Sequence, residues 1–392
     1  MTKSHAVEVW LIDGARSAPS PQDVLRELCE RLVACEVPIE RAAVFVKTLH
    51  PMVMGRSFTW RSDTGVKVAE APVGFDDSET YRASPVAAVV VSRTVVRRRL
   101  GEASAPRDFP VLDELASEGI TDYIALPLLF GSGEVHVATF STMAPGGFSE
   151  DDISGLEAVI VPLTRIAEIW ALRRVATNLL STYVGRQAGA KVLAGKILRG
   201  DAERIEAVIW MTDIRNSTQL ADRMAPPDFV TLLNRFFDAQ VPAITANGGE
   251  VLKYIGDGLL AIFPTGSDRP AYAACASAAS AATTARSQLA ADLPELGFGI
   301  ALHFGEILYG NIGSGDRLDF TCIGPAVNLS ARLEKLTAVT GRSVLASATV
   351  AGHHPAAFEP LGDFELPGFA RNQHVYALRD GIPAAPTVVS SL

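Results

Sequence analysis

Two aspartates, Asp213 and Asp257, occupy places in the sequence where carboxylates can hold a metal ion. Asp213 lies in TDIRNST and Asp257 lies in IGDG, and each ends a run of β-forming residues and is followed by a turn. If the two strand ends are neighbours, the carboxylates meet, and Mg²⁺ is commonly held by one or two carboxylates together with substrate phosphates. The pair therefore predicts a divalent cation site, although either aspartate alone is better interpreted as an ordinary turn residue.

The turn that follows Asp213 has residue types that suit phosphate. Asn216, Ser217 and Thr218 come just before a helical stretch. Backbone N–H groups at the start of a helix point outward and bind phosphate oxygens. We therefore expect these three residues to form a phosphate-binding turn.

A second polar pair lies in VNLSARLE, where Asn328 and Arg332 are four residues apart. This spacing places both side chains on one face of a helix. An isolated pair of this kind is usually just solvated, but here it follows DFTCIGPA, which predicts a strand and a Gly-Pro turn. An asparagine and an arginine side by side would suit a nucleotide whose phosphate gains charge in the transition state.

Four strings carry these residues in order: MTDIRNST, LKYIGDGLLAIF, GIALHFGEILYGNIGSGDRLDFT and CIGPAVNLSARLE. Together they resemble the catalytic domain of class III nucleotidyl cyclases over about 180 residues, with the same order and spacing. The resemblance implies a ferredoxin-like βαββαβ core of the α+β type. It also implies a lyase that acts as a head-to-tail homodimer, with its active sites at the interface between the chains.

The resemblance implies specific roles for the metal residues. Asp213, Ile214 and Asp257 would bind two Mg²⁺ or Mn²⁺ ions in each active site. One ion would lower the pKa of the ribose 3′-OH, and the other would neutralise the triphosphate.

The remaining site residues would act on a nucleotide bound to the partner chain's aspartates. Lys253 and Thr321 would read the purine, Asn328 would orient the ribose and Arg332 would stabilise charge on the α-phosphate. A homodimer would then hold two equivalent composite sites, and a monomer would hold none.

The purine-reading residues favour ATP as the substrate. In the family both lie three residues before a glycine, which here gives Lys253 before Gly256 and Thr321 before Gly324. Lysine can donate to N1 of adenine and threonine can accept from its amino group, whereas guanine reverses these polarities. Guanylate-specific members of the family resemble this pattern but carry Glu and Cys at the two positions. Cys322 is one residue away from the second position, so its side chain would face the opposite side of a strand.

Several alternatives stay open. A guanylate cyclase and a catalytically silent dimeric nucleotide or ligand sensor are the competing interpretations. The threonine resembles a subgroup that includes bicarbonate-responsive enzymes, so bicarbonate sensitivity is an open hypothesis. The late hairpin that can supply a triphosphate-binding lysine reads FELPGFARNQ and contains none; its nearest cation is Arg371.

The first part of the chain, residues 1–165, predicts a separate regulatory domain. Helical spacing marks 21–38, a strand is expected over 41–49, two strands around a Gly-Ser-Gly turn over 122–143, and a long helix over 148–170. Ser149 and Asp152 form a capping-box-like start for that helix. This order resembles a GAF-like sensor domain, and another α+β module of similar size is the alternative. Its regulator, a small molecule or a protein, is unknown.

Residues 166–200 are expected to form a helical linker. Leu156, Val159, Leu163, Ile166 and Trp170 are spaced by threes and fours, as in a coiled-coil stalk. The equal alternative is a helix that packs on its own sensor domain. Pro162, which cannot donate a backbone hydrogen bond, is expected to kink or restart the helix.

The catalytic domain is expected over 201–380, with a flexible tail over 381–392. Its predicted elements are strands over 206–214 and 250–264, a helix over 226–248, an alanine-rich helix around 271–285, a strand pair over 297–313 and a helix over 326–341. His303 is expected to pack or bond locally.

Composition limits the class of protein. The chain of 392 residues is 48% hydrophobic and 20% charged, which supports two folded cores. Its net charge of −9 gives no general reason to expect binding to nucleic acid. No apolar run is long enough to span a membrane, and no cysteines form a C-x-x-C pair. We therefore expect a cytoplasmic protein with reduced thiols.

Overall fold

The chain divides into two units, Met1–Leu179 and Leu180–Leu392. This computed structural model describes residues 3–102, 105–315 and 317–380. The tail expected over 381–392 lies outside the described residues. Within the described parts, none of the helices combines the length and the apolar character needed to cross a membrane.

The first unit is built on a six-stranded antiparallel sheet in the order β3-β2-β1-β6-β5-β4. The strands are β1 (Arg41–Lys47), β2 (Val53–Arg61), β3 (Gly65–Pro72), β4 (Val96–Arg98), β5 (Asp122–Leu129) and β6 (Val135–Thr142). The helices are α1 (His5–Ile12), α2 (Pro21–Ala34), α3 (Glu79–Arg82), α4 (Pro85–Ser92), α5 (Pro110–Ser117) and α6 (Glu150–Tyr183), with a 3₁₀ turn at Phe75–Asp77.

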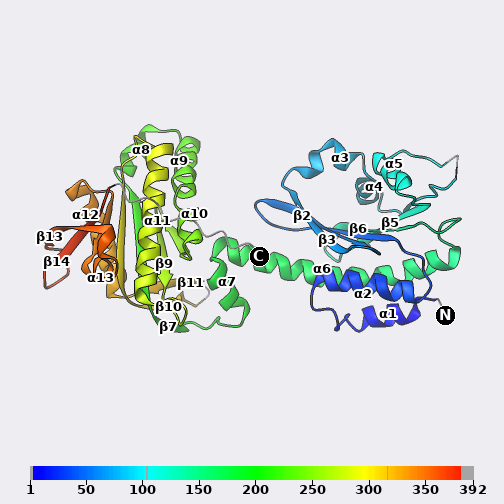
Figure 1. Cartoon of the computed structure of the whole chain (residues 1–392), viewed down its shortest axis with the longest axis horizontal. Coiled ribbons are helices and arrows are strands. Elements are labelled where there is room, and N and C mark those ends of the chain that lie inside the picture. The colour runs from blue at the N-terminus through cyan, green and yellow to red at the C-terminus, as the bar shows by residue number, and fades with distance from the viewer. Residues whose placement is uncertain (1–2, 103–104, 316, 381–392) are drawn as a thin grey trace. The chain divides into compact units, whose positions relative to one another are not determined.

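Helices cover both faces of this sheet (Figure 1). Helices α1, α2 and α6 pack on one face, where Leu28, Leu156 and Phe140 are fully buried. Helices α4 and α5 pack on the other face around Val89 and Leu112. The result is a three-layer unit with a core on each side of the sheet.

Helix α6 begins where the sequence predicts. The Ser149 N–H and hydroxyl donate to Asp152 Oδ2 at 3.0 and 2.6 Å, and Asp152 N–H donates back to Ser149 Oγ at 3.2 Å. This exchange satisfies N–H groups that the first helical turn leaves without partners. The helix then continues for 34 residues through Pro162, so it does not restart there.

The side chains proposed for a coiled-coil seam are used inside the first unit. Leu156, Val159, Leu163 and Ile166 are buried in its core, and Trp170 packs against the same core. These contacts match the alternative in which this stretch packs on its own domain.

The second unit contains a sheet in the order β13-β14-β12-β10-β7-β9-β8, and β11 pairs with β10. The strands are β7 (Ala202–Ile214), β8 (Glu250–Ile255), β9 (Gly258–Pro264), β10 (Phe298–Ser314), β11 (Arg317–Ile323), β12 (Val344–Ser347), β13 (Phe358–Phe364) and β14 (Gln373–Leu378). The helices are α7 (Arg186–Leu193), α8 (Ser217–Arg223), α9 (Pro226–Asp238), α10 (Val241–Ala246), α11 (Ala271–Asp292), α12 (Pro325–Thr340) and α13 (Ala348–His353), with a 3₁₀ turn at Pro355–Ala357.

The predicted βαββαβ succession is present in this unit. It runs β7, α9 with α10, β8, β9, α11 and β10, and its strands lie in the spatial order β10-β7-β9-β8. Helix α11 lies against one face of the sheet (Figure 1). It buries Ala274, Ala278, Ala281, Ala282 and Ala285 completely. The other face carries α7, α12 and β11.

Two predicted elements differ in the structure. The single helix expected over 226–248 is two helices, α9 and α10, because Pro242 cannot donate to the carbonyl four residues earlier. The strand pair expected over 297–313 is one long strand, β10. A Cβ on Gly310 would lie 2.0 Å from the Asp201 carbonyl oxygen, so this glycine allows close strand approach and does not form a turn.

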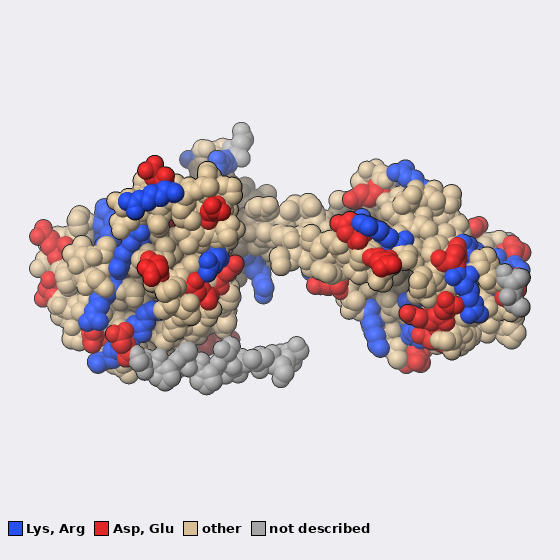
Figure 2. Space-filling view, turned by 90° about the horizontal axis from the view of Figure 1, so that it is seen from above, with Lys and Arg blue, Asp and Glu red and all other residues tan. Residues whose placement is uncertain are grey.

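Charged side chains of both signs lie on the face of the molecule shown in Figure 2. Figure 2 shows acidic and basic groups interspersed on the face in view.

Candidate active site

Asp213 and Asp257 meet at one end of the second unit's sheet. Asp213 is near the end of β7, and Asp257 lies in the turn between β8 and β9. A Cβ on the adjoining Gly258 would lie 2.3 Å from the Thr212 carbonyl oxygen and 3.1 Å from Asp213 Oδ1. The turn can therefore reach the end of β7 only because residue 258 has no side chain.

The Asp257 carboxylate perturbs the Asp213 carboxylate. Burial, hydrogen bonding with Asp257 and the negative charges of Asp257 and Glu334 together raise the pKa of Asp213 to about 7. Asp257 Oδ2 is buried and has no hydrogen-bond partner among the described residues. A buried carboxylate oxygen without a partner, facing a second carboxylate, is the arrangement that a divalent cation would stabilise.

The residues present fit such a cation with phosphate as a further ligand. The described chain holds no group of three His, Cys, Asp or Glu side chains arranged to bind a metal. Mg²⁺ does not need such a group when substrate phosphates supply the remaining oxygens. Ile214 directly follows Asp213, and its N–H donates to Asp213 Oδ1 at 3.1 Å.

Glu334 is a nearby carboxylate that sequence reasoning missed. It lies on α12, and burial is the first cause that raises its pKa to about 6, with the Asp257 charge contributing. Gly299 is the cross-strand partner of Asp213, and a Cβ there would lie 2.5 Å from Glu334 Oε1. The sequence signal would be a glutamate on the buried face of a helix. It can be recognised only once the buried face of α12 is known.

The turn predicted to bind phosphate follows β7 directly. Asn216 adopts a left-handed conformation with φ of 58°, and its carbonyl accepts from the N–H groups of Gln219 and Leu220 in α8. Arg215, which sequence reasoning also missed, donates to the carbonyl oxygens of Thr337 and Arg342, both at 2.8 Å. These bonds anchor the turn to the end of α12.

Ser217 and Thr218 form the first positions of α8. Thr218 is exposed and Ser217 is half-buried. Their backbone groups therefore lie immediately beside the carboxylate pair along the chain.

Lys253 and Thr321 lie on two strands that contact each other, β8 and β11. Lys253 Nζ lies 3.2 Å from Asp319 Oδ2, which joins β8 to β11. Asp319 and Thr321 are two residues apart on β11, so their side chains share a face. Thr321 is 5% exposed, and its Oγ1 has no partner among the described residues. Asp319 was not singled out by the sequence.

Asn328 and Arg332 lie on one face of α12, as their spacing predicts. Both residues are exposed. Within the described residues, neither side chain has a hydrogen bond or ion pair, so both are free to contact a bound molecule. Arg371 is also exposed, in the connection between β13 and β14.

One chain therefore presents the predicted residues as separate groups. The carboxylate pair and its turn form the first group, and Lys253 with Asp319 and Thr321 form the second. The Lys253 ammonium is engaged by Asp319 and not by either aspartate of the pair.

Comparison with known proteins finds a family match within the second unit. Residues 201–380 match the family model of the adenylate and guanylate cyclase catalytic domain. An uncharacterized protein of Mycobacterium bovis is 37% identical over 177 residues, which is 45% of this chain and 32% of that protein. An uncharacterized protein of Mycobacterium tuberculosis is 35% identical over 185 residues, or 47% of this chain and 32% of that one. The matches thus span about a third of these relatives.

Solved structures are similar over a comparable share of the chain. The adenylyl cyclase CyaB from P. aeruginosa has a TM-score of 0.41 and 24% identity, covering 47% of this chain and 98% of that one. The guanylyl cyclase Cya2 has a TM-score of 0.37 and 23% identity, covering 45% and 93%. By the family match, residues 201–380 of the second unit are similar to the adenylate and guanylate cyclase catalytic domain.

Proposed function

We propose that the protein is an adenylate cyclase that converts ATP to 3′,5′-cyclic AMP and pyrophosphate. The observation that carries the proposal is the pair Asp213 and Asp257. Their carboxylates meet at a strand end, one buried oxygen lacks a partner, and a turn suited to phosphate follows directly. A site of this kind fits a nucleoside triphosphate bound with divalent cations.

In the proposed reaction the ribose 3′-oxygen attacks the α-phosphorus. The new bond is 3′-O–P, the bond to the β-phosphate oxygen breaks, pyrophosphate leaves with the electron pair and the 3′-OH proton passes to solvent. Asp213, Ile214 and Asp257 would hold two Mg²⁺ or Mn²⁺ ions, which supply activation of the hydroxyl and neutralisation of the triphosphate. Asn216, Ser217 and Thr218 would bind phosphate oxygens.

Residues of α12 would act on the reacting centre. Arg332, exposed and unpaired within the described chain, would stabilise the charge that grows on the α-phosphate. Asn328, one helical turn earlier, would hold the ribose in a productive orientation.

Lys253 and Thr321 favour adenine over guanine. Lys253 can donate to N1 of adenine, and the unpartnered Thr321 Oγ1 can accept from the adenine amino group. Asp319 would hold the lysine ammonium in place at 3.2 Å. A second candidate, guanylate cyclase activity, is favoured by the same Asp319 carboxylate, because a carboxylate can accept from the donor groups of guanine.

We also propose that the active enzyme is a homodimer. Within one chain, Lys253 is paired with Asp319 and with neither Asp213 nor Asp257, so a second copy would complete each site. Exposed apolar side chains near this cluster support such an interface. Leu308 and Ile323 face each other across β10 and β11 and are 40% and 46% exposed, and Tyr254 on β8 is 54% exposed.

The first unit is proposed to be a GAF-like sensor that regulates the cyclase. Its six-stranded sheet with helices on both faces, and the cavities within it, suit a ligand-binding domain.

The experiment that tests the function is direct product analysis. Purified full-length protein is incubated with ATP or GTP and Mg²⁺ or Mn²⁺, and nucleotides are separated by chromatography. We expect cyclic AMP from ATP and little cyclic GMP from GTP, and the Asp257→Ala variant should lose nearly all turnover. Preferential formation of cyclic GMP would select the second candidate.

The absence of any cyclic product with both nucleotides and both metals, from protein verified as dimeric, would contradict the enzyme proposal. Unchanged activity in Asp257→Ala would instead contradict the assignment of the site.

A further inference from the structure

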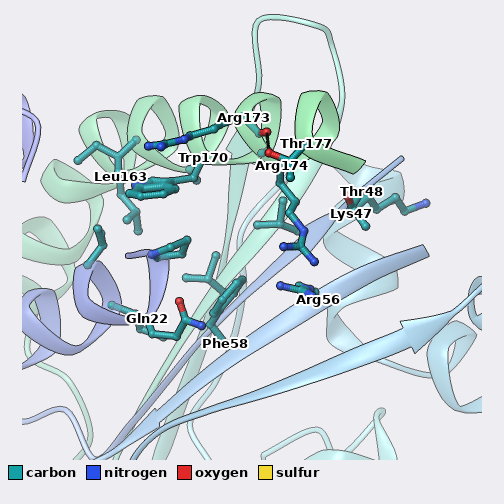
Figure 3. A pocket seen from close by; sticks show the side chains of 18 residues that line it. Gln22, Lys47, Thr48, Arg56, Phe58, Leu163, Trp170, Arg173, Arg174 and Thr177 are labelled. Carbon is teal, nitrogen blue, oxygen red and sulfur yellow. Dashed lines mark hydrogen bonds between the residues drawn. The ribbon is translucent and has the colours of Figure 1, made fainter. Parts of the chain in front are cut away.

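The first unit contains a cavity that the proposed cyclase chemistry does not use. Its volume is about 310 Å³, and it lies between strands β1 and β2 of the sheet and helices α2 and α6 (Figure 3). Small-molecule sites in proteins are commonly about 300–1,000 Å³, so this cavity is large enough for a small ligand.

Most of the cavity wall is apolar. Side chains from all four elements line it, among them Val24, Leu25, Val44, Phe58, Leu163 and Ile166. The Trp170 ring faces the cavity from α6, above Phe58 on β2 (Figure 3). Apolar and aromatic surfaces at this position would bind an aliphatic or aromatic body by excluding water.

One end of the cavity is cationic. The guanidinium groups of Arg56 on β2 and Arg174 on α6 are directed toward one another (Figure 3). Arg56 is paired with Glu70 of the neighbouring strand, whereas Arg174 has no hydrogen bond or ion pair within the described residues. Two guanidinium groups and one carboxylate leave this end with a net positive charge.

The Arg56 charge also acts electrostatically on Arg174. Burial lowers the pKa of the Arg174 guanidinium, the Arg56 charge lowers it further, and Glu70 opposes the shift. An anion placed between the guanidinium groups would relieve this repulsion, and a planar guanidinium matches a carboxylate or a phosphate through paired hydrogen bonds.

Other charged groups near the cavity are already directed elsewhere. The Arg173 guanidinium lies over the Trp170 ring at 5.5 Å from its centre, and it points away from Arg56 (Figure 3). Lys47 lies 3.5 Å from Asp76. The Gln22 amide lines the cavity at its α2 side and can contribute a neutral hydrogen bond.

We propose that this cavity binds a small amphipathic anion, with an acyl chain or similar apolar body against Phe58 and Trp170 and a carboxylate or phosphate head between Arg56 and Arg174. The site is independent of the nucleotide site, and the proposal does not rest on cyclase activity. A second cavity of about 720 Å³ in this unit is lined by Arg56 but not by Arg174 or Trp170, so these two residues distinguish the sites.

Calorimetric titration of the full chain, without nucleotide, tests the proposal. The probes are decanoate, decyl phosphate and decanol, all below the concentration at which they form micelles. We expect saturable binding of one anion per chain, with decanol at least about 10-fold weaker, since hydrogen bonds to charged groups contribute a factor of this order. Tighter binding of decanoate or of decyl phosphate identifies the head group.

Variants locate the site. Arg174→Gln should raise the dissociation constant of the preferred anion about 10-fold or more, and Ala171→Phe, which fills the cavity, should abolish binding. The matched control is Arg165→Gln, which removes an exposed cation from the same helix outside the cavity and should change the constant less than about 2-fold. Thermal unfolding of each variant verifies that it is folded.

Three results would overturn the proposal. The first is that no anion gives a heat of binding up to about 1 mM. Any dissociation constant would then be weaker than that of a specific site. The second is equal affinity for decanol and the anions. The third is an Arg174→Gln variant that is folded and binds like the wild type, which would direct attention to the larger cavity.

Discussion

At the scale of single residues, Gly258 decides whether the two aspartates can meet. Its Cα hydrogen occupies the place where a methyl group would lie 2.3 Å from the Thr212 carbonyl oxygen. The Gly258→Ala variant must therefore displace the turn that carries Asp257. We expect a loss of about 1–3 kcal/mol in the free energy of unfolding. We also expect a fall in cyclase rate of about 100-fold, because small displacements of reacting groups are costly.

The matched control for this variant is Gly266→Ala. A Cβ at Gly266 has no neighbour within 4 Å, and this glycine has no left-handed backbone conformation. Urea unfolding and initial rates of both variants provide the comparison. If Gly258→Ala turned over ATP as fast as Gly266→Ala, close approach of the turn would not be required for activity.

His303 predicts a pH dependence of stability. Its ring is buried, its Nδ1 lies 2.8 Å from Ser347 Oγ, and burial lowers its pKa from 6.5 to about 4. Between pH 6.5 and 4 the unfolded chain therefore binds a proton at this residue that the folded chain does not, so stability must fall as the pH decreases through this window. The loss attributable to His303 should reach roughly 3 kcal/mol at pH 4.

Urea unfolding of wild type and His303→Gln at pH 7.5, 6.5, 5.5 and 4.5 measures this contribution. Other carboxylates titrate in both proteins, so the difference between the two pH profiles isolates His303. Parallel profiles would show that the His303 ring has the same pKa in the folded and the unfolded chain.

At the scale of elements, Glu250 attaches helix α7 to the sheet of the second unit. Its carboxylate accepts from Ala188 N–H at 3.2 Å and from the Tyr309 hydroxyl at 3.0 Å. Glu250→Ala leaves both buried donors without a partner, which should cost about 1–3 kcal/mol. Hydrogen exchange of the α7 amides should become faster, because the first turn of this helix loses its anchor.

Glu203→Ala is the control for this element. Glu203 also contacts α7, through an exposed ion pair with Lys191 at 2.7 Å. Pairs of this kind contribute about 0–1 kcal/mol, so α7 exchange should change little. Equal exchange rates in the two variants would mean that α7 is held by its apolar contacts alone.

The sequence predicted elements best where one local signal dominates. The Ser149–Asp152 exchange marks the start of α6, and the period of apolar residues marks α2, with Ser20 capping its first turn. The helix break at Pro242 and the continuity of β10 through Gly310 were mispredicted. Proline and glycine can each interrupt an element or lie within one, and the surrounding fold decides which occurs. Strands β2 and β3 were not foreseen, since VMGRSFTWR lacks clear alternation.

The candidate site was predicted only where residues stand inside a recognisable string. Asp213, Asp257, Asn328 and Arg332 could be named in this way, and α12 places the last two on one exposed face. Asp319, Glu334 and Arg215 could not be named, because their partners lie on other strands or helices and arise only from the pairing register.

At the scale of the whole molecule, a composite site can be tested by complementation. Asp257→Ala and Arg332→Ala chains, each inactive as a homodimer, should together form one intact site and one doubly altered site. A purified heterodimer should therefore recover about half of the wild-type rate per dimer, as expected when the two residues belong to opposite sides of each site.

Differently tagged chains, purified by both tags in sequence, provide the heterodimer for this measurement. No recovery in a heterodimer of verified composition would contradict the assignment of these two residues to different chains.

The alanines of α11 have a consequence for where this protein tolerates substitution. Five alanines of this helix are fully buried, including Ala278 and Ala282, so the gap between the helix layer and the sheet is set by methyl groups. A larger side chain cannot be absorbed by rotation and must push the helix away from β7 and β9. Strand β7 ends just after Asp213, and β9 begins just after Asp257. A larger residue in place of a buried α11 alanine would thus shift the two aspartates, although the alanine itself takes no part in chemistry.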